Sequence, residues 1–333
     1  MRSTARRFPR AARLRVSVLA AGAAVALVAT LVPSAAEAGP TATKTKGDPV
    51  TATIRIASYN AGSMVRVPRT VSDVKALMDK GADIIALQEM SSWKKRSKIQ
   101  KRFVDCATCV YDAWMPVKAV PGGQPILYRS DKFTLLGTGM VQVSPDTYVG
   151  PRGAGPSTMR AKYIIWARLR EISTQRQVYV LNNHAVPTVQ QGNGRPNKQK
   201  KRLQLYRMHM DGLRALIDQI KTTTGGSIFV LGDLNVNYRS DRVVKDPLFP
   251  FYNMGQVGAA ATFETLGIPD RGTHVLPNGF DKRIIDYGYY VQRRWVTPVA
   301  QQIVVGLHSD HRPLLVDYTL QSRGCFRHHA SVC

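Results

Sequence analysis

The chain has 333 residues, of which 44% are hydrophobic and 21% are charged. This composition excludes a protein that is disordered throughout, and it supplies the core of one large α/β domain, which we favour over two small ones. The 47 Lys and Arg residues outnumber the 22 Asp and Glu residues, so the formal net charge is +25. Such a surplus indicates a polyanionic partner, because cations that neutralise phosphates release bound counterions. A soluble, highly charged protein without such a partner is the alternative.

The first 38 residues have the pattern of a cleaved secretory signal. Six arginines precede an apolar run from Val16 to Val32, and the small-residue site Ala36-Glu37-Ala38 follows. This order of regions predicts export and cleavage near Ala38, which would lower the net charge to about +20. A single membrane anchor is the alternative, since the run approaches the roughly 20 residues that a span needs. The export route stays open.

Residues 39–53 are rich in Thr, Lys and Gly and lack hydrophobic periodicity, so we predict a flexible lead-in before a domain that covers 54–320. Short apolar runs predict the strands Ile54–Tyr59, Ile84–Leu87, Ile126–Tyr128, Tyr163–Leu169, Val178–Leu181, Ile228–Leu231, Ile284–Tyr290 and Pro313–Tyr318. Helical periodicity appears at Val71–Met78 and Leu203–Ile220.

The connections between these elements are of several kinds. Glu171–Gln175 predicts a hairpin turn, so some neighbouring strands should be antiparallel and the sheets mixed. Ser144–Ser157 and Gln191–Asn197 predict long loops, which in a compact domain are usually functional or disordered.

Polar residues that a core does not need follow several of the predicted strands. They are Asn60, Glu89, His184, Asp233, Asn235, Asp286 and the sequence Ser309-Asp310-His311. Each of them alone is more often a turn residue than a ligand. Because active sites are built at strand ends, the set as a whole indicates one site.

The order of these motifs resembles that of the endonuclease/exonuclease/phosphatase superfamily over roughly residues 54–320. The specific pieces are GDLN at 232–235 and SDHRP at 309–313, joined by Asn60, the QE of Glu89 and the H-x-x-P of His184. The superfamily includes deoxyribonucleases, abasic-site endonucleases, bacterial sphingomyelinases and inositol polyphosphate phosphatases. The resemblance implies an α/β (α+β) four-layer sandwich, in which two packed mixed β-sheets are flanked by helices.

The resemblance also implies a divalent-metal site. Asn60, Glu89 and Asp310 would hold magnesium, or another divalent cation such as manganese or calcium. Magnesium prefers hard oxygen ligands from one or two carboxylates, and Glu89 and Asp310 supply them.

The same resemblance assigns catalytic roles to five residues. His311 would contact the phosphate while Asp286 holds its other ring nitrogen. Asp233 would orient or deprotonate the attacking water. Asn235 and His184 would donate hydrogen bonds to phosphoryl oxygens, and whether His184 is instead the general acid stays open.

Several basic residues are candidates for phosphate binding. Arg160 precedes a predicted strand where relatives place a phosphate-contacting Arg. One basic cluster holds Lys94, Lys95, Arg96, Lys98, Lys101 and Arg102, and a second holds Lys198, Lys200, Lys201 and Arg202. Both clusters would form a basic rim around the site. The alternative is that each is a solvated helix face.

We therefore expect a secreted, metal-dependent phosphodiesterase, monomeric and without stable membrane association, that acts on nucleic acid. A sphingomyelinase-like enzyme is the main alternative, followed by a soluble phosphomonoesterase. A polyanion-binding protein without activity would explain the charge but not the motifs.

The chain has four cysteines, Cys106, Cys109, Cys325 and Cys333. Three connectivities are possible in an exported protein, and the local one, Cys106–Cys109 with Cys325–Cys333, is the simplest. A zinc site that includes His328 and His329 competes with it.

Overall fold

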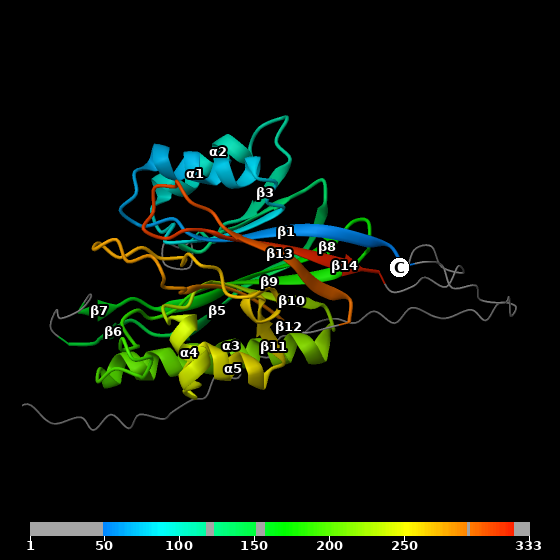
Figure 1. The fold of residues 1–333 in the computed structure, drawn as a ribbon. Helices are drawn as coiled ribbons and strands as arrows, with labels where there is room; N and C mark the ends of the chain where they lie inside the picture. Colours follow the sequence, from blue (N-terminus) through cyan, green and yellow to red (C-terminus); the bar gives the residue numbers. More distant parts are fainter. Residues whose placement is uncertain (1–48, 118–122, 151–156, 292–293, 323–333) are drawn as a thin grey trace, which may run out of the picture. The chain divides into compact units, whose positions relative to one another are not determined.

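Two six-stranded β-sheets form the centre of the protein, and helices cover the outer face of each (Figure 1). The computed structural model describes residues 49–117, 123–150, 157–291 and 294–322, which lie in the unit Lys44–Cys333. The predicted four-layer sandwich is confirmed. The predicted signal segment and the Cys325–Cys333 pair fall outside the described residues.

The first sheet has the strand order β13-β14-β1-β2-β4-β3. Its strands are β1 (Thr51–Asn60), β2 (Ile84–Gln88), β3 (Tyr111–Trp114), β4 (Ile126–Arg129), β13 (Val296–Ile303) and β14 (Leu314–Gln321). The helices α1 (Val67–Asp79) and α2 (Trp93–Phe103) cover its outer face (Figure 1).

The second sheet has the order β11-β12-β10-β9-β8-β5. Its strands are β5 (Phe133–Ser144), β8 (Lys162–Glu171), β9 (Gln177–His184), β10 (Ser227–Asp233), β11 (Ala259–Ala261) and β12 (Asp286–Val291). The outer layer holds α3 (Lys200–Thr223), α4 (Tyr238–Val244) and α5 (Pro250–Gln256), with α6 (Thr262–Leu266) after β11. A short pair, β6 (Thr147–Tyr148) and β7 (Thr158–Met159), lies within the predicted loop 144–157 and just beyond it.

Both faces of the central strands are buried, which explains their nearly continuous apolar sequence. In β2, Ile84 and Ala86 belong to the core between the two sheets, while Ile85 and Leu87 pack with side chains of α1 and α2. Successive side chains of a strand point to opposite faces, so only a strand covered on both sides buries four in a row.

All eight predicted strands and both predicted helices are present, but the sequence patterns missed β3, β5, β11 and β13 and the short pair β6 and β7. β3 and β13 are the two edge strands of the first sheet, and β5 and β11 are those of the second. Pro298 is tolerated in β13 because an edge strand has one side free of ladder hydrogen bonds. Gly139 in β5 makes room for the ring of Trp166, which a Cβ would approach within 2.4 Å. β1 also begins at Thr51, inside the predicted lead-in, because Thr51 pairs with Gln321 of β14.

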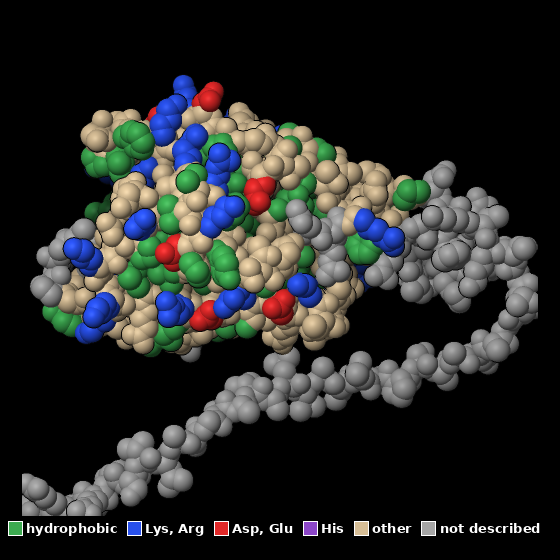
Figure 2. All heavy atoms as spheres, turned by 60° about the horizontal axis from the view of Figure 1, so that its bottom comes forward, with side chains coloured by type: hydrophobic (Ala, Val, Ile, Leu, Met, Phe, Trp, Pro, Cys, Tyr) green, Lys and Arg blue, Asp and Glu red, His purple; other side chains and the backbone are tan. Residues whose placement is uncertain are grey.

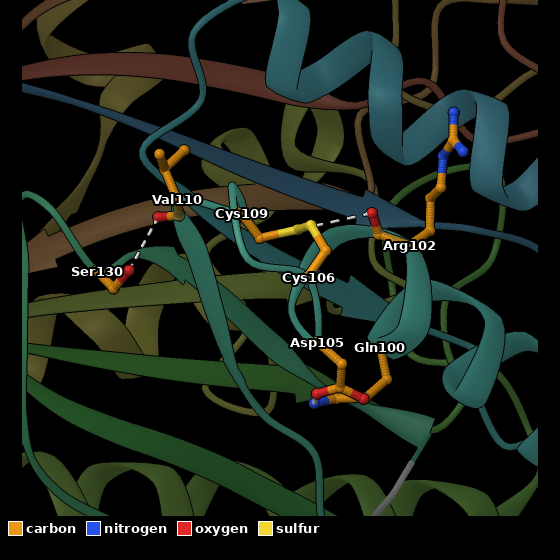
Figure 3. The surroundings of a disulfide bond; sticks show 7 residues. All are labelled: Gln100, Arg102, Asp105, Cys106, Cys109, Val110 and Ser130. Atoms are coloured by element: carbon orange, nitrogen blue, oxygen red, sulfur yellow. Dashed lines mark hydrogen bonds between the residues drawn. A yellow bond between two sulfur atoms is a disulfide. The ribbon is translucent and has the colours of Figure 1, made fainter.

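A disulfide between Cys106 and Cys109 follows α2, with the two Cα atoms 5.2 Å apart (Figure 3). This half of the predicted local pairing is confirmed. Because the disulfide uses both sulfur atoms, it is incompatible with the alternative zinc site. Within the described ranges, no helix combines the length and the apolar composition of a membrane span.

Candidate active site

Two pairs of parallel strands end at the same edge of the sandwich and bring their polar end residues together. Asn60 of β1 lies beside Gln88 of β2, and His184 of β9 lies beside Asp233 of β10. The amide of Asn60 donates to Asp233 Oδ2 at 3.0 Å, which links the two sheets. Residues about 170 positions apart in sequence therefore form one site.

Glu89 is held directly beside Asn60. Its Oε1 accepts a hydrogen bond from Asn60 Nδ2 at 3.3 Å, and its Oε2 accepts one from the backbone N–H of Ser63 at 2.6 Å. Burial opposes ionisation, but His184 and these hydrogen bonds lower the pKa of Glu89 below its usual value. The side chain is 28% exposed, so it offers an accessible, ionised oxygen ligand.

Asp286 and His311 form a buried ion pair. His311 Nδ1 lies 2.9 Å from Asp286 Oδ2, and the other ring nitrogen lies 3.8 Å from Asp233 Oδ2. Burial lowers the pKa of His311, but Asp286 and Asp233 outweigh it and raise the pKa to about 10. The side chain is therefore an imidazolium at neutral pH, with Nε2 turned toward Asp233.

The GDLN motif places Asp233 and Asn235 by an unusual backbone path. Gly232 has φ 131°, and a Cβ there would lie 2.0 Å from the carbonyl oxygen of Asn183, so only glycine fits. Asp233 Oδ1 accepts the N–H of Asn235 at 2.8 Å, and Asn235 Nδ2 donates to the carbonyl of Ala185 at 3.3 Å. Burial raises the pKa of Asp233, although His311 opposes the rise.

His184 lies between the two carboxylates, with Nε2 3.8 Å from Glu89 Oε1 and 3.7 Å from Asp233 Oδ2. Burial and the nearby ammonium group of Lys162 lower the pKa of His184 to about 4. At neutral pH the ring is therefore uncharged and can donate one hydrogen bond. This favours the hydrogen-bonding role over that of an imidazolium general acid.

Lys162 was missed in the sequence, and it begins β8 beside the carboxylates. It lines a cavity of about 210 Å³ together with Glu89, His184 and the predicted phosphate ligand Arg160. Burial lowers the pKa of Lys162 to about 8, against the pull of Asp233 and Glu89. Arg160 itself is 78% exposed and lies 3.9 Å from Asp146. The sequence signal for Lys162 is its position two residues after Arg160 at the start of β8, because residues two apart in an extended chain lie on the same face.

Asp310 lies on a separate loop, 308–311, at the same edge. Ser309 of this loop approaches Gly62 so closely that a Cβ on the glycine would lie 3.0 Å from the serine Oγ. Asp310 Oδ2 lies 3.6 Å from Nε2 of His274, another residue that the sequence patterns missed. The imidazole of His274 lowers the pKa of Asp310 to about 2. Asp310 is 65% exposed and borders a cleft of about 440 Å³ that His311 also lines.

Glu89 and Asp310 have the donor chemistry that a hard divalent cation prefers. Glu89 and Asp310 are accessible, and both have lowered pKa values, so each carries a negative charge at neutral pH. Asn60, the third predicted ligand, donates through Nδ2 to Glu89, and its Oδ1 accepts the backbone N–H of Gly62 at 3.1 Å. Two groups of three side chains also bring possible ligand atoms within 4.8 Å of one another. They are His274 with Asp310 and His311, and Asp233 with Asp286 and His311. The second of these groups is accounted for by the Asp286–His311 ion pair.

The predicted basic rim is wrong for Lys95, Arg96 and Arg202, which are buried. Lys95 Nζ donates to the carbonyls of Gly62 and Ser63 at 2.6 and 3.1 Å, and so supports the loop that binds Glu89. Arg96 donates to the carbonyl of Pro116 at 2.6 Å. Burying a charged group is costly unless it is hydrogen-bonded. These residues therefore stabilise the backbone segments to which they donate, and they do not form part of an exposed phosphate-binding surface.

Other members of the two clusters are exposed. They are Lys94, Lys98, Lys101, Arg102, Lys198, Lys200 and Lys201. Lys201 donates to the carbonyl of Tyr148 at 3.1 Å and lies near its ring. Lys94 and Lys200 stand in the first turns of α2 and α3.

The chain matches no known family model and no curated protein sequence. Several solved structures are similar. An endonuclease/exonuclease/phosphatase family protein from Bacteroides thetaiotaomicron is 16% identical, with a TM-score of 0.60, over 85% of this chain and 100% of that one. A mannosyl-6-phosphatase from the same species is 15% identical, with a TM-score of 0.54, over 80% and 99%.

A third similar structure is D. rerio TDP2 in complex with a single-strand DNA product, which is 14% identical with a TM-score of 0.54. It covers 80% of this chain and 98% of that one. The chain therefore has the endonuclease/exonuclease/phosphatase fold, as its motifs predicted.

Proposed function

We propose that this protein is a secreted, metal-dependent phosphodiesterase that hydrolyses nucleic acid. One observation carries the catalytic part of the proposal: six of the residues that the motifs single out meet at one edge of the sandwich. They are Asn60, Glu89, His184, Asp233, Asp286 and His311. The proteins of similar fold include a phosphatase and one protein bound to a DNA product, which supports phosphoester chemistry.

Hydrolysis of a phosphodiester needs an oriented water, positive charge against the phosphoryl oxygens and a proton for the leaving oxygen. A divalent cation on Asn60, Glu89 and Asp310 would neutralise charge on the phosphoryl group. The imidazolium of His311 and the ammonium group of Lys162 would add charge from the chain itself. Asp233 is suited to accept a proton from the attacking water, because burial raises its pKa.

Nucleic acid is the substrate that the charge favours. The net charge is +25 for the full chain and about +20 after the predicted cleavage. On the side that carries α3, α4 and α5, the Lys and Arg side chains are widely spread while acidic ones are few (Figure 2). One observation favours the lipid alternative: Met64 is 92% exposed and Trp93 is 66% exposed, on the segments that follow Asn60 and Glu89. Exposed apolar side chains of this kind enter membrane interfaces.

The proposed activity is tested by incubating the purified protein with plasmid DNA, RNA and sphingomyelin vesicles, each with magnesium and with a chelator. We expect cleavage of nucleic acid that requires the metal. Hydrolysis of sphingomyelin alone would support the lipid phosphodiesterase. Binding of DNA by the protein without hydrolysis of any substrate would support a polyanion-binding protein.

A second prediction concerns how nucleic acid binds. Changing the exposed Lys94, Lys98, Lys200 and Lys201 together to Ala should flatten the salt dependence of duplex binding by metal-free protein. Each lost phosphate contact reduces the slope of log K against log salt by about 0.9, so the four substitutions remove at most about 3.6. Cleavage of a small model diester should be unchanged, because none of the four reaches the buried carboxylates.

The control removes three cations from the opposite edge of the sheets. They are Lys80, Lys221 and Arg294, which lie shortly before the starts of β2, β10 and β13. We expect the control variant to keep the salt slope of the unaltered protein. Equal slopes in the two variants would mean that the charge acts diffusely and that no basic rim exists.

A further inference from the structure

We propose that Asp73 is a positioning residue that locks the loop 308–311 to β1, and so sets Asp310 and Asn60 in register for the metal. The inference rests on the proposed metal-dependent function. Asp73 lies on α1, one layer away from the strand ends, and it belongs to none of the motifs.

The carboxylate of Asp73 is buried and gathers three hydrogen bonds. Its Oδ1 lies 2.6 Å from Nδ1 of His308, and its Oδ2 accepts the backbone N–H of the same residue at 3.1 Å. Oδ2 also accepts the hydroxyl of Tyr59 at 2.7 Å. Asp73 is 1% exposed, so both oxygens depend on these partners rather than on water.

The two partners belong to the two segments that carry metal ligands. Tyr59 directly precedes Asn60 at the end of β1, and His308 lies two residues before Asp310. One carboxylate therefore joins the two segments, which are about 250 residues apart in sequence. The far half of the loop is attached elsewhere, through Val275 N–H to the carbonyl of Asp310 and Arg312 N–H to that of Thr273.

The energetic reason for the lock is that a buried carboxylate without donors is costly. If His308 moved away, Asp73 would keep only the Tyr59 hydroxyl and would lose the two donors that satisfy its remaining lone pairs. The loop is consequently restrained in one position. A restrained carboxylate at Asp310 binds a cation without first losing conformational freedom. Loss of the hydrogen bonds between Asp73 and His308 should therefore lower the affinity for the metal.

The test measures binding of Mn²⁺ by calorimetry, together with thermal unfolding, in the unaltered protein and in three variants. His308 is 38% exposed, so His308→Ala should fold and should weaken Mn²⁺ binding by about tenfold or more. Asp73→Asn should weaken it at least as much, because an amide cannot accept all three hydrogen bonds. The double variant should be no weaker than Asp73→Asn alone, since both changes open the same lock. Lys75→Ala, two residues along α1 and exposed, is the matched control and should bind Mn²⁺ normally.

A purely structural role predicts lower unfolding temperatures in His308→Ala and Asp73→Asn with Mn²⁺ affinity equal to that of the unaltered protein, and that result would overturn the inference. Strictly additive losses in the double variant would overturn it as well. If the unaltered protein itself bound no Mn²⁺, the metal-dependent function would fail and this inference would fall with it. Binding by the unaltered protein therefore separates the two failures.

Discussion

His311→Ala is expected to lower turnover of a phosphodiester substrate by roughly 10²- to 10⁴-fold, the range typical of a lost proton-transfer or charge-stabilising group. The reason is that His311 is the buried imidazolium of the site, paired with Asp286 and close to Asp233. Asp286→Asn should reduce turnover strongly as well, because the imidazolium loses the carboxylate that raises its pKa.

Steady-state rates on a small diester at neutral pH measure both effects. Lys282→Ala is a suitable control, because Lys282 is exposed and, among the described residues, its ammonium group donates only to the carbonyl of Asp270. Turnover in Asp286→Asn equal to that of the unaltered protein would contradict the assigned dyad and leave Asp286 a structural residue.

The Asp286–His311 ion pair determines the direction in which the free energy of unfolding changes with pH. The folded-state pKa of His311 is raised to about 10, above an unfolded value of about 6.5. Its contribution to the free energy of unfolding is therefore fully present below about pH 6.5 and is lost as the pH rises through about 10. Asp286→Asn should cost about 3–5 kcal/mol at pH 6, as expected when one partner of a buried pair is removed. In urea unfolding, this difference should shrink between pH 6.5 and 10.

Glu89→Gln and Asp310→Asn are each expected to reduce magnesium-dependent hydrolysis by about a hundredfold or more. Each replaces a charged oxygen ligand with a neutral group of nearly the same shape, and a catalytic cation contributes several kcal/mol to charge stabilisation. Both side chains are partly exposed, so the fold should be retained.

Rates of hydrolysis across a magnesium titration test this prediction, and circular dichroism checks that each variant is folded. Partial recovery of activity at high magnesium would show that the substitution acts through metal affinity. Full activity in both variants at ordinary magnesium would remove the metal assignment of Glu89 and Asp310.

The central strands and the positions of the candidate catalytic residues could be predicted from the sequence for a local reason. A strand buried on both faces leaves a continuous apolar run, and a polar residue directly after such a run must lie at the sheet edge. Asn60, Glu89, His184 and Asp233 all follow runs of this kind. The edge strands β3, β5 and β13 left no such run, because most of their side chains are partly or fully exposed.

The tertiary structure alone decided which charged residues serve the site. Lys95 and Lys94 are neighbours in one basic run, yet Lys95 is buried against the carbonyls of Gly62 and Ser63 while Lys94 is exposed. Nothing local separates them, because the difference depends on which face of α2 packs against the loop after β1. Lys162, His274 and Asp73 acquire their surroundings in the same way. Their partners come from segments distant in the chain, so only the packing of the two sheets and α1 brings them together.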